Sequence, residues 1–569
     1  MTRISSCPIE VLPPRSTAFR SPRRARKRRA MVLIIVLVVV AALCLGALAF
    51  SSLMVGEREV THMTGRGIQA MALAESGIEA ARQFLMEHPD VEYAEGAWYH
   101  DLDQFQGVLV IDDEIAQDRG RFSIVAPGET QGSNDVRFGF VCESSKLNLN
   151  TLLTGSDTDA TAARERLMVL PGMTEEIADC ILDWLDEDDE PREFGVEAEY
   201  YESLATPYRP TNGPIRCLEE LLAVRGVTSG HLLGADRNRN GVLDADESDS
   251  SMVSEADVAN GSLQGGWSAY LTLHSRESIR REDGEPKINL NQDDAQTLHD
   301  ELEAAFGTDW ARFIVGYRQQ EQANSQSSAG TSETNQDSQD KQNDTNASET
   351  SSTSATAGAT AAGSDSVAIE YADRVPEQLD LTKPLNRKLD SVLDLIGSSI
   401  QVKYDDGKKI VTVSPLFANE PEAMRDYLPK LLDQVTTETE ETVAGRINVN
   451  LAPVEVLASV PGIDATLAEN IVGHRPAEPS SVEAYQRHST WLLVDGLVSL
   501  DQMKKLLPYL TAGGSVFQVG TVGFFDEGGP VVRLQAVLDA TESPPRMLSL
   551  KDLTPLGRGF DPASLGAKP

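Results

Sequence analysis

The sequence predicts an α+β fold: a long N-terminal helix and an antiparallel sheet, with a large, mostly α-helical domain inserted into the sheet. An uncharged apolar run near the N-terminus continues into an amphipathic stretch. Segments with alternating apolar and polar residues lie near both ends of the chain. The middle carries helical patterns, so we expect segments from both ends to complete one sheet around an insertion.

The N-terminal apolar run covers residues 31–55 and contains no charged residue. As a helix it would be about 37 Å long, enough to cross a hydrocarbon core of about 30 Å. Arg and Lys dominate residues 23–29, so the positive-inside rule predicts a cytoplasmic N-terminus and an exported remainder. The alternative is a signal peptide cleaved after Ala49, although such apolar regions are usually only about 7–15 residues long.

A second helical stretch follows over residues 57–88, and Pro89 is expected to end it. Apolar residues recur in it at intervals of three and four, which predicts one apolar stripe along a helix. The stripe consists of Met71, Ala74, Ile78, Ala81 and Leu85.

Five strands are predicted from alternation and from the Gly, Asp and Pro turns between them. They are Gly107–Ile111, Arg121–Ala126, Val136–Cys142, Ser515–Phe524 and Val531–Asp539. Between the two groups, a five-residue motif with a basic residue first and Asn third and fifth occurs three times. The three copies of this repeated phrase are Lys146–Asn150, Lys287–Asn291 and Arg446–Asn450. Asn at the end of a strand can cap the next helix, so we interpret these Asn residues as structural.

The net charge of −38 is unfavourable for nucleic acid, because phosphate neutralisation requires Lys and Arg. It fits an exported domain or one that binds cations. Pro171-Gly172 and Pro461-Gly462 resemble half of a helix-hairpin-helix, which leaves a membrane-anchored DNA-binding protein as one alternative. Cys142, Cys180 and Cys217 would allow one disulfide in an oxidising compartment, and the sequence does not select the pair.

Residues 236–247 match the spacing of an EF-hand calcium loop. Oxygen ligands would come from Asp236, Asn238, Asn240, the Val242 carbonyl, Asp244 and Glu247. Gly241 would permit the sharp turn at the sixth position. No clear exit helix follows Glu247, so the sequence predicts an isolated, structural calcium site.

The N-terminal layout resembles that of type IV pilin-like proteins, whose basic leader is removed by a prepilin peptidase. The Ala30-Met31 junction is similar to the cleavage site, with Ala30 where the family usually has Gly, and Met31 would then be methylated. Most members carry Glu at the fifth mature position, which is Ile35 here. That absence resembles the K-type minor pseudopilin of type II secretion.

An acidic segment strengthens the resemblance to the K-type proteins. The matching residues, in order, are Asp183-Trp184, Gly195, Glu197, Tyr200-Tyr201, Pro207-Tyr208, Asn212 and Glu219–Gly226. The family's helical domain is associated with bound calcium, which implies a second site at Asp183, Asp186, Asp188 and Glu197. A solvated acidic face remains open, and a hydrolytic metal site is disfavoured because no His lies near this cluster.

The resemblance implies a role in assembly without enzymatic activity. It implies a subunit in the inner membrane with its bulk in the periplasm, which forms or caps the tip of the pseudopilus and supports export of folded proteins. The implied partners are the I- and J-type minor pseudopilins, the major pseudopilin and the prepilin peptidase, with no nucleic acid. Residues 71–85 would pack against partner subunits. A minor pilin of a type IV pilus is a further alternative.

The expected organisation has seven segments. They are a cytoplasmic leader (1–30), the membrane and amphipathic helix (31–88), the first part of the sheet (89–150), the first part of the inserted domain with the calcium loop (151–318), a disordered low-complexity linker (319–366), the second part of the insert (367–445) and a final segment with an Asn-x-Asn phrase, a helical hairpin and the rest of the sheet (446–569).

Overall fold

The structure is a computed structural model. It describes residues 25–88, 98–128, 136–153, 160–242, 244, 247, 266–320, 368–372, 379–404, 409–476 and 482–568. Most of the predicted leader and of the predicted linker lies outside the described residues. The chain forms two compact units, Met1–Gln69 and Ala70–Pro569.

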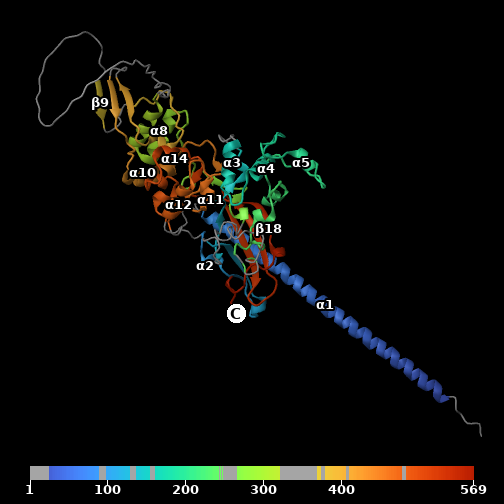
Figure 1. Ribbon diagram of the computed structural model, residues 1–569. Helices are drawn as coiled ribbons and strands as arrows, with labels where there is room; N and C mark the ends of the chain where they lie inside the picture. Colours follow the sequence, from blue (N-terminus) through green and yellow to red (C-terminus); the bar gives the residue numbers. More distant parts are fainter. Residues whose placement is uncertain are drawn as a thin grey trace, which may run out of the picture. The chain divides into compact units, whose positions relative to one another are not determined.

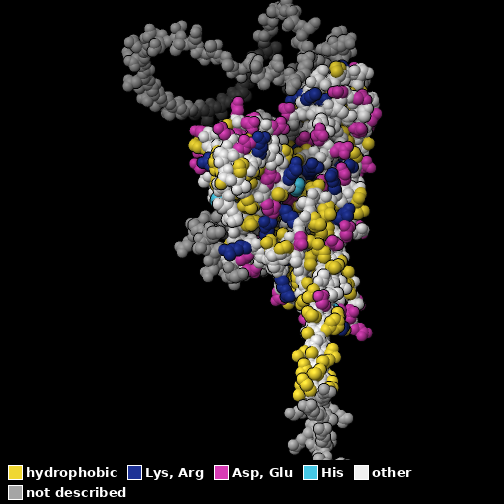
Figure 2. Space-filling model, turned by 90° about the vertical axis from the view of Figure 1, so that its right-hand side faces the viewer, with side chains coloured by type: hydrophobic (Ala, Val, Ile, Leu, Met, Phe, Trp, Pro, Cys, Tyr) yellow, Lys and Arg dark blue, Asp and Glu magenta, His cyan; other side chains and the backbone are white. Residues whose placement is uncertain are grey.

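The two predicted N-terminal helices form one continuous helix, α1 (Ala25–Glu87). In the first unit, the side chains from Met31 to Val55 are exposed and overwhelmingly apolar. Figure 2 shows hydrophobic side chains along the visible part of this helix. Among the described residues, this is the one helix that is long and apolar enough to cross a membrane. Its end at Glu87 agrees with the position of the helix breaker Pro89.

The central sheet combines strands from both ends of the chain, as predicted. Its order is β1-β2-β16-β17-β18, and short strands β3 and β4 pair with β2 and β16. The bounds are β1 (Val108–Ile111), β2 (Gly120–Pro127), β3 (Val136–Arg137), β4 (Val141–Cys142), β16 (Val516–Phe525), β17 (Val532–Asp539) and β18 (Arg546–Asp552). β2 and β16 are antiparallel neighbours, paired from Val125↔Gly520 to Gly120↔Phe525. The segment between them is therefore an insertion into one sheet.

Two details of the sheet differ from the prediction. The expected strand Val136–Cys142 is interrupted and forms β3 and β4 separately. The edge strand β18 was not predicted, because its side chains are exposed or half-buried on both faces and show no clear alternation.

The C-terminal part of α1 packs on this sheet. Its buried side chains form one core with the sheet; they are Ala70, Leu73, Ala74, Ile78, Ala81, Phe84 and Leu85. The expectation that the stripe from Met71 to Leu85 contacts partner subunits is therefore wrong for this face. The sequence shows that the helix has an apolar face, but the chain's own sheet covers it, and only Met71 remains half-buried.

The inserted region contains three copies of one module, here called the Asn-x-Asn modules. Each begins with a two-residue strand from the repeated phrase and ends with a parallel partner strand. The strand pairs are β5 (Leu147–Asn148) with β6 (Leu271–Thr272), β8 (Ile288–Asn289) with β12 (Val435–Thr436), and β14 (Ile447–Asn448) with β15 (Leu510–Thr511). The second module thus spans the predicted linker, so residues 151–318 and 367–445 do not fold as separate halves.

Each module contains a helix pair joined by a tight turn with a positive-φ glycine. The pairs are α3 (Ala160–Met168) with α4 (Glu175–Leu185), α8 (Ala295–Phe306) with α9 (Thr308–Arg318), and α11 (Val454–Ala458) with α12 (Ala465–His474). The other described helices and strands are α2 (Leu102–Phe105), α5 (Ala198–Glu202), α6 (Ser229–Leu233), α10 (Pro421–Gln434), α13 (Trp491–Val494), α14 (Leu500–Leu506), β7 (Arg276–Ser278), β9 (Ala368–Ala372), β10 (Ile400–Tyr404), β11 (Lys409–Val413) and β13 (Thr442–Ala444) (Figure 1).

The repeated Asn residues share two hydrogen bonds in all three modules. The first Asn accepts from the backbone N–H of the second, at 2.8–3.1 Å. The second Asn donates its amide to a distant carbonyl, that of Ile215, Leu389 or Gln486. Because the amides satisfy backbone groups where each strand ends, the structural interpretation of these residues is confirmed.

Candidate metal centre

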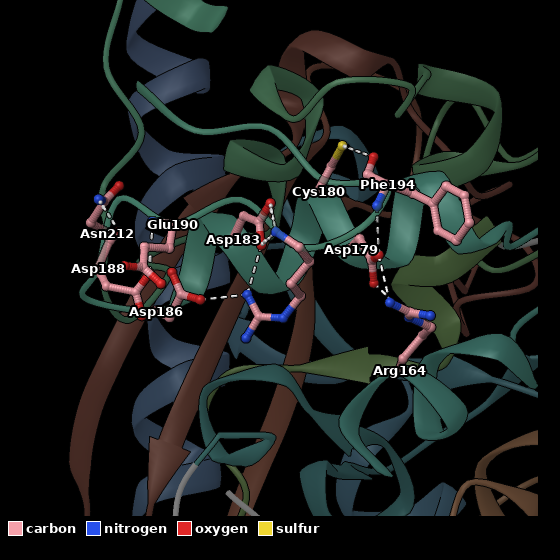
Figure 3. Close-up of polar contacts among 10 residues, drawn as sticks. Arg164, Asp179, Cys180, Asp183, Asp186, Asp188, Glu190, Phe194 and Asn212 are labelled. Atoms are coloured by element: carbon pink, nitrogen blue, oxygen red, sulfur yellow. Dashed lines mark hydrogen bonds and ion pairs between the residues drawn. The ribbon is translucent and has the colours of Figure 1, made fainter. Parts of the chain in front are cut away.

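Helix α4 aligns two buried aspartates, Asp179 and Asp183, one turn apart on the same face. Asp179 accepts from Arg164 Nε at 2.6 Å and Nη2 at 2.7 Å, and from the Phe194 backbone N–H at 3.1 Å. Asp183 accepts from Arg192 Nη1 at 2.7 Å and from the Arg192 backbone N–H (Figure 3). The two carboxylates therefore fix the returning loop against the helix.

The approach of this loop requires glycine at position 195. A Cβ atom there would lie 1.8 Å from Asp183 Oδ2. Any other residue would push the loop away from α4 and separate Asp183 from the side chains that follow in the loop. The Gly-x-Glu spacing in the sequence thus has a steric cause.

Three carboxylates meet beside the loop. One oxygen each from Asp183, Asp186 and Glu197 lies within 4.8 Å of the others. Glu197 is 6% exposed, and neither of its carboxylate oxygens has a hydrogen-bond partner among the described residues. Asp186 Oδ1 is also buried and has no partner in the described part of the chain. Buried carboxylate oxygens normally have partners, so the donor set fits a hard cation.

Arg192 provides the one guanidinium in contact with this carboxylate cluster among the described residues. Its Nη1 donates to both Asp183 and Asp186. One positive charge therefore faces three carboxylates, which leaves negative charge for a divalent cation to neutralise. Sequence reasoning did not identify Arg192, although it is the one basic residue in the run from Asp183 to Glu199.

Burial raises the pKa of Asp183 and Asp186 despite their bonds to Arg192. Burial, followed by repulsion from Asp183 and Asp186, raises the pKa of Glu197 to about 7. The folded-state pKa of Glu197 thus exceeds its unfolded value. Without a cation, its contribution to stability is present below about pH 4.5 and is lost as the pH rises through about 7. A cation bound here would compete with a proton for Glu197, so its binding would weaken as the pH falls below about 7.

Asp188 does not join the cluster. Its side chain is exposed and accepts from the Glu190 backbone N–H at 2.8 Å, while its carbonyl accepts from Asn212 (Figure 3). The prediction of Asp188 as a fourth ligand is therefore wrong. Asp186 caps the end of α4 and stays beside Asp183, whereas Asp188 lies two residues further on and its side chain accepts from the backbone of the next turn.

The second candidate is the predicted calcium loop, whose described residues are 236–242, 244 and 247. Asp236 accepts from the Asn240 and Gly241 backbone N–H groups at 3.1 and 2.8 Å. Glu247 accepts from the Arg237 and Asn238 N–H groups at 2.9 and 3.1 Å. Gly241 has a φ of +76°, as the predicted turn requires.

The side chains of this loop converge on Asp244. Asn238 Nδ2 and Asn240 Nδ2 donate to Asp244 Oδ2 at 2.6 and 3.1 Å. Asn238 Oδ1 is buried and has no partner among the described residues. Burial raises the pKa of Asp236. The structure therefore links Asp236, Asn238, Asn240, Asp244 and Glu247 by hydrogen bonds, with Val242 in the same turn, and these residue types supply the oxygen ligands that calcium prefers.

The hairpins that resemble DNA-binding motifs have negative charge where a phosphate would bind. Asp464 caps α12 and accepts from the Leu467 N–H at 2.7 Å. The first turn of α4 carries Glu175 and Glu176. Carboxylates at a helix N-terminus repel phosphate, which argues against the DNA-binding alternative.

Cys180 and Cys217 carry free thiols.

Comparison with known proteins identifies one segment. Residues 145–233 match the family model of type II secretion system protein K. We call residues 145–233 the protein K segment. This segment contains the helix pair α3–α4 of the first Asn-x-Asn module and the cluster of Asp183, Asp186 and Glu197, and it ends before the calcium loop. The resemblance to K-type proteins predicted from the sequence is confirmed over the protein K segment.

One solved structure is similar over much of the chain. It is a chain in the crystal structure of the GspK-GspI-GspJ complex from the type 2 secretion system of enterotoxigenic Escherichia coli. The two chains are 10% identical, with a TM-score of 0.35, and the match covers 87% of this chain and 99% of the other. No curated protein sequence matches the chain.

Proposed function

We propose that this protein is a minor pseudopilin of a type II secretion system. It forms or caps the tip of the periplasmic pseudopilus and supports export of folded proteins across the outer membrane. The match of the protein K segment carries the proposal. The arrangement of α1 on a sheet built from both chain ends supports it, because it provides a helical assembly element and a rigid base for the insertion. The role is assembly and requires no catalysis.

The proposed location is the inner membrane, with a cytoplasmic N-terminus and a periplasmic bulk. The apolar residues 31–55 of α1 and the basic residues before them support this orientation. After removal of the leader, the same helix would pass from the bilayer into the filament.

The I- and J-type minor pseudopilins and the major pseudopilin are the proposed partners. Within Ala70–Glu87 the sheet covers the apolar stripe, so partners would contact the opposite face, where Ala72, Glu75, Glu79 and Gln83 are exposed. Ile35 replaces the carboxylate that would otherwise pair with a neighbouring subunit in the membrane. A subunit at the tip has no neighbour above it, and the large insertion would obstruct further stacking.

We also propose that calcium binds at two places as a structural ion. Asp183, Asp186 and Glu197 would hold one ion beside Arg192, and the 236–247 loop would hold another. The unpartnered buried oxygens of Glu197, Asp186 and Asn238 support both sites. At each, calcium would neutralise carboxylates that burial otherwise makes costly to ionise.

Mass spectrometry of the mature N-terminus tests the assembly role. Because a prepilin peptidase would cut between Ala30 and Met31, the expected first residue is methylated Met31. A protein from the same cells with the basic leader replaced by a signal peptidase substrate provides the control. A mature chain beginning at Phe50, or an intact Met1, would contradict processing as a pseudopilin.

A further inference from the structure

The calcium loop contacts the central sheet as well as the insertion that contains it. Arg533, in β17, is 3% exposed. Its Nη1 donates to the Asn238 carbonyl at 2.9 Å, and its Nη2 donates to the Arg239 carbonyl at 2.7 Å. From the same loop, Asn240 Nδ2 donates to the Gly559 carbonyl at 2.6 Å. Two of the predicted calcium ligands, Asn238 and Asn240, thus also bond to the sheet and to the segment after it.

The loop and the sheet approach closely. A Cβ atom on Gly241 would lie 2.7 Å from the ring of Pro127, at the end of β2. At the side of this contact, Lys551 of β18 donates to both oxygens of Glu219 at 2.9 Å, and Arg239 donates to Glu219 at 2.6 Å. Burial opposes ionisation of Glu219, but the bonds and charge of Lys551 and Arg239 lower its pKa to about 2.

The charges at this interface are incompletely balanced. Burial lowers the pKa of Arg533, and the carboxylates of Asp236, Asp244 and Glu247 oppose that effect. Three carboxylates of the loop thus attract one buried guanidinium, whose hydrogen bonds go to backbone carbonyls. Asn238 Nδ2 donates to Asp244 Oδ2, and its Oδ1 is buried without a partner among the described residues. A half-turn of the amide would direct this oxygen at the Asp244 carboxylate. Only a cation between them would make that orientation favourable, because oxygen atoms repel one another.

We propose that a calcium ion bound by the 236–247 loop holds the insertion against the central sheet through Arg533. The inference rests on the calcium site proposed above. Ordering of the loop around the ion would fix the carbonyls of Asn238 and Arg239 in the positions that Arg533 binds. Arg533 is a positioning residue and does not contact the ion. The loop lies outside residues 145–233, so this contact is a property of the chain beyond its protein K segment.

Hydrogen exchange of the full chain in detergent tests the inference, with calcium chloride added to protein first stripped by a chelator. Calcium binding is measured in parallel by titration calorimetry. In the unmodified chain, calcium should slow amide exchange at least about tenfold both in residues 236–242 and in residues 531–560. Magnesium at the same concentration should give little protection, because the loop offers more ligands than magnesium accepts from protein.

Two substitutions separate the ion site from the interdomain contact. Glu247→Gln should weaken binding at this site more than about tenfold and abolish protection of both segments. Arg533→Met should retain binding within a few-fold while residues 531–560 lose their calcium-dependent protection. If Arg533→Met does not fold, Arg533→Lys tests the same point. A lysine ammonium cannot reproduce the two hydrogen bonds that the planar guanidinium donates to the carbonyls of Asn238 and Arg239. Glu542→Gln, which removes an exposed carboxylate, should behave as the unmodified chain.

The outcomes distinguish the two parts of the inference. If Glu247→Gln removes calcium binding but calcium does not protect residues 531–560 in the unmodified chain, the proposed site stands and the proposed contact with the sheet is wrong. Binding unchanged by Glu247→Gln would overturn the site itself. Protection of residues 531–560 that persists in Arg533→Met, or in Arg533→Lys where that variant is used, would overturn the role of Arg533. None of these three results bears on the secretion role, which has separate tests.

Discussion

Gly523→Val is expected to separate α1 from the sheet and to destabilise the second unit by about 3 kcal/mol or more. Gly523 lies in β16 beneath the helix. A Cβ atom there would be 2.2 Å from the Ala70 carbonyl oxygen and 2.6 Å from the Ala74 nitrogen. Both are backbone atoms, so no side-chain rotation can relieve the clash. The core shared by α1 and the sheet would have to open.

Thermal unfolding of the full chain in detergent, followed by circular dichroism, measures this loss. Gly473→Ala is a matched control, because Gly473 lies in α12 and its Cβ would meet nothing within 4 Å. Alanine in a helix should be neutral or stabilise by about 0.5–1 kcal/mol. Equal melting of Gly523→Val and the unmodified chain would show that α1 does not pack on β16 as described.

Asp183→Ala should destabilise the insertion by about 3–5 kcal/mol, because removing one partner of a buried ion pair leaves the other charge unpaired. Asp183 has no exposed surface and binds both the backbone and the side chain of Arg192. Its loss would free the loop that carries Glu197 and should also remove calcium binding at this cluster. Limited proteolysis near residues 190–197 and calcium titration measure the two effects.

Asp188→Asn is the matched control for Asp183→Ala. Asp188 lies five residues later but is exposed and outside the cluster, so its substitution should change stability by less than about 0.5 kcal/mol. Calcium affinity should fall only slightly, through the lost long-range charge. If Asp188→Asn weakened calcium binding as much as Asp183→Ala, the ligand set would have to include Asp188.

The sequence was informative where structure is local. The strands near β2 and β16 alternate clearly and could be predicted. The proposed calcium ligands lie within twelve consecutive positions, so their spacing is visible in the sequence. The stripe on α1 was also evident, but a pattern on one helix does not identify what covers it. In the structure the covering surface includes β2 and also β16, which lies more than 400 residues further along the chain.

The parts of the candidate site that were missed depend on distant or returning segments. Glu197 was predicted as a member of this cluster, whereas Arg192 was missed, because it reaches Asp183 only where the chain turns back along α4 and Gly195 permits close approach. Asp183 and Asp188 look equivalent in an acidic run, and only the end of α4 separates their environments. The bonds from Arg533 to the calcium loop link residues almost 300 positions apart, which spacing along the sequence cannot indicate.

Secretion by cells that lack this protein is the most direct test of the proposed role. The measurement compares the amount of a folded cargo of the type II system in the periplasm and in the medium. The account predicts that deletion leaves the cargo in the periplasm and that the full chain restores its release, whereas a chain without residues 31–55 does not. Normal release of the cargo from the deletion strain would contradict the account.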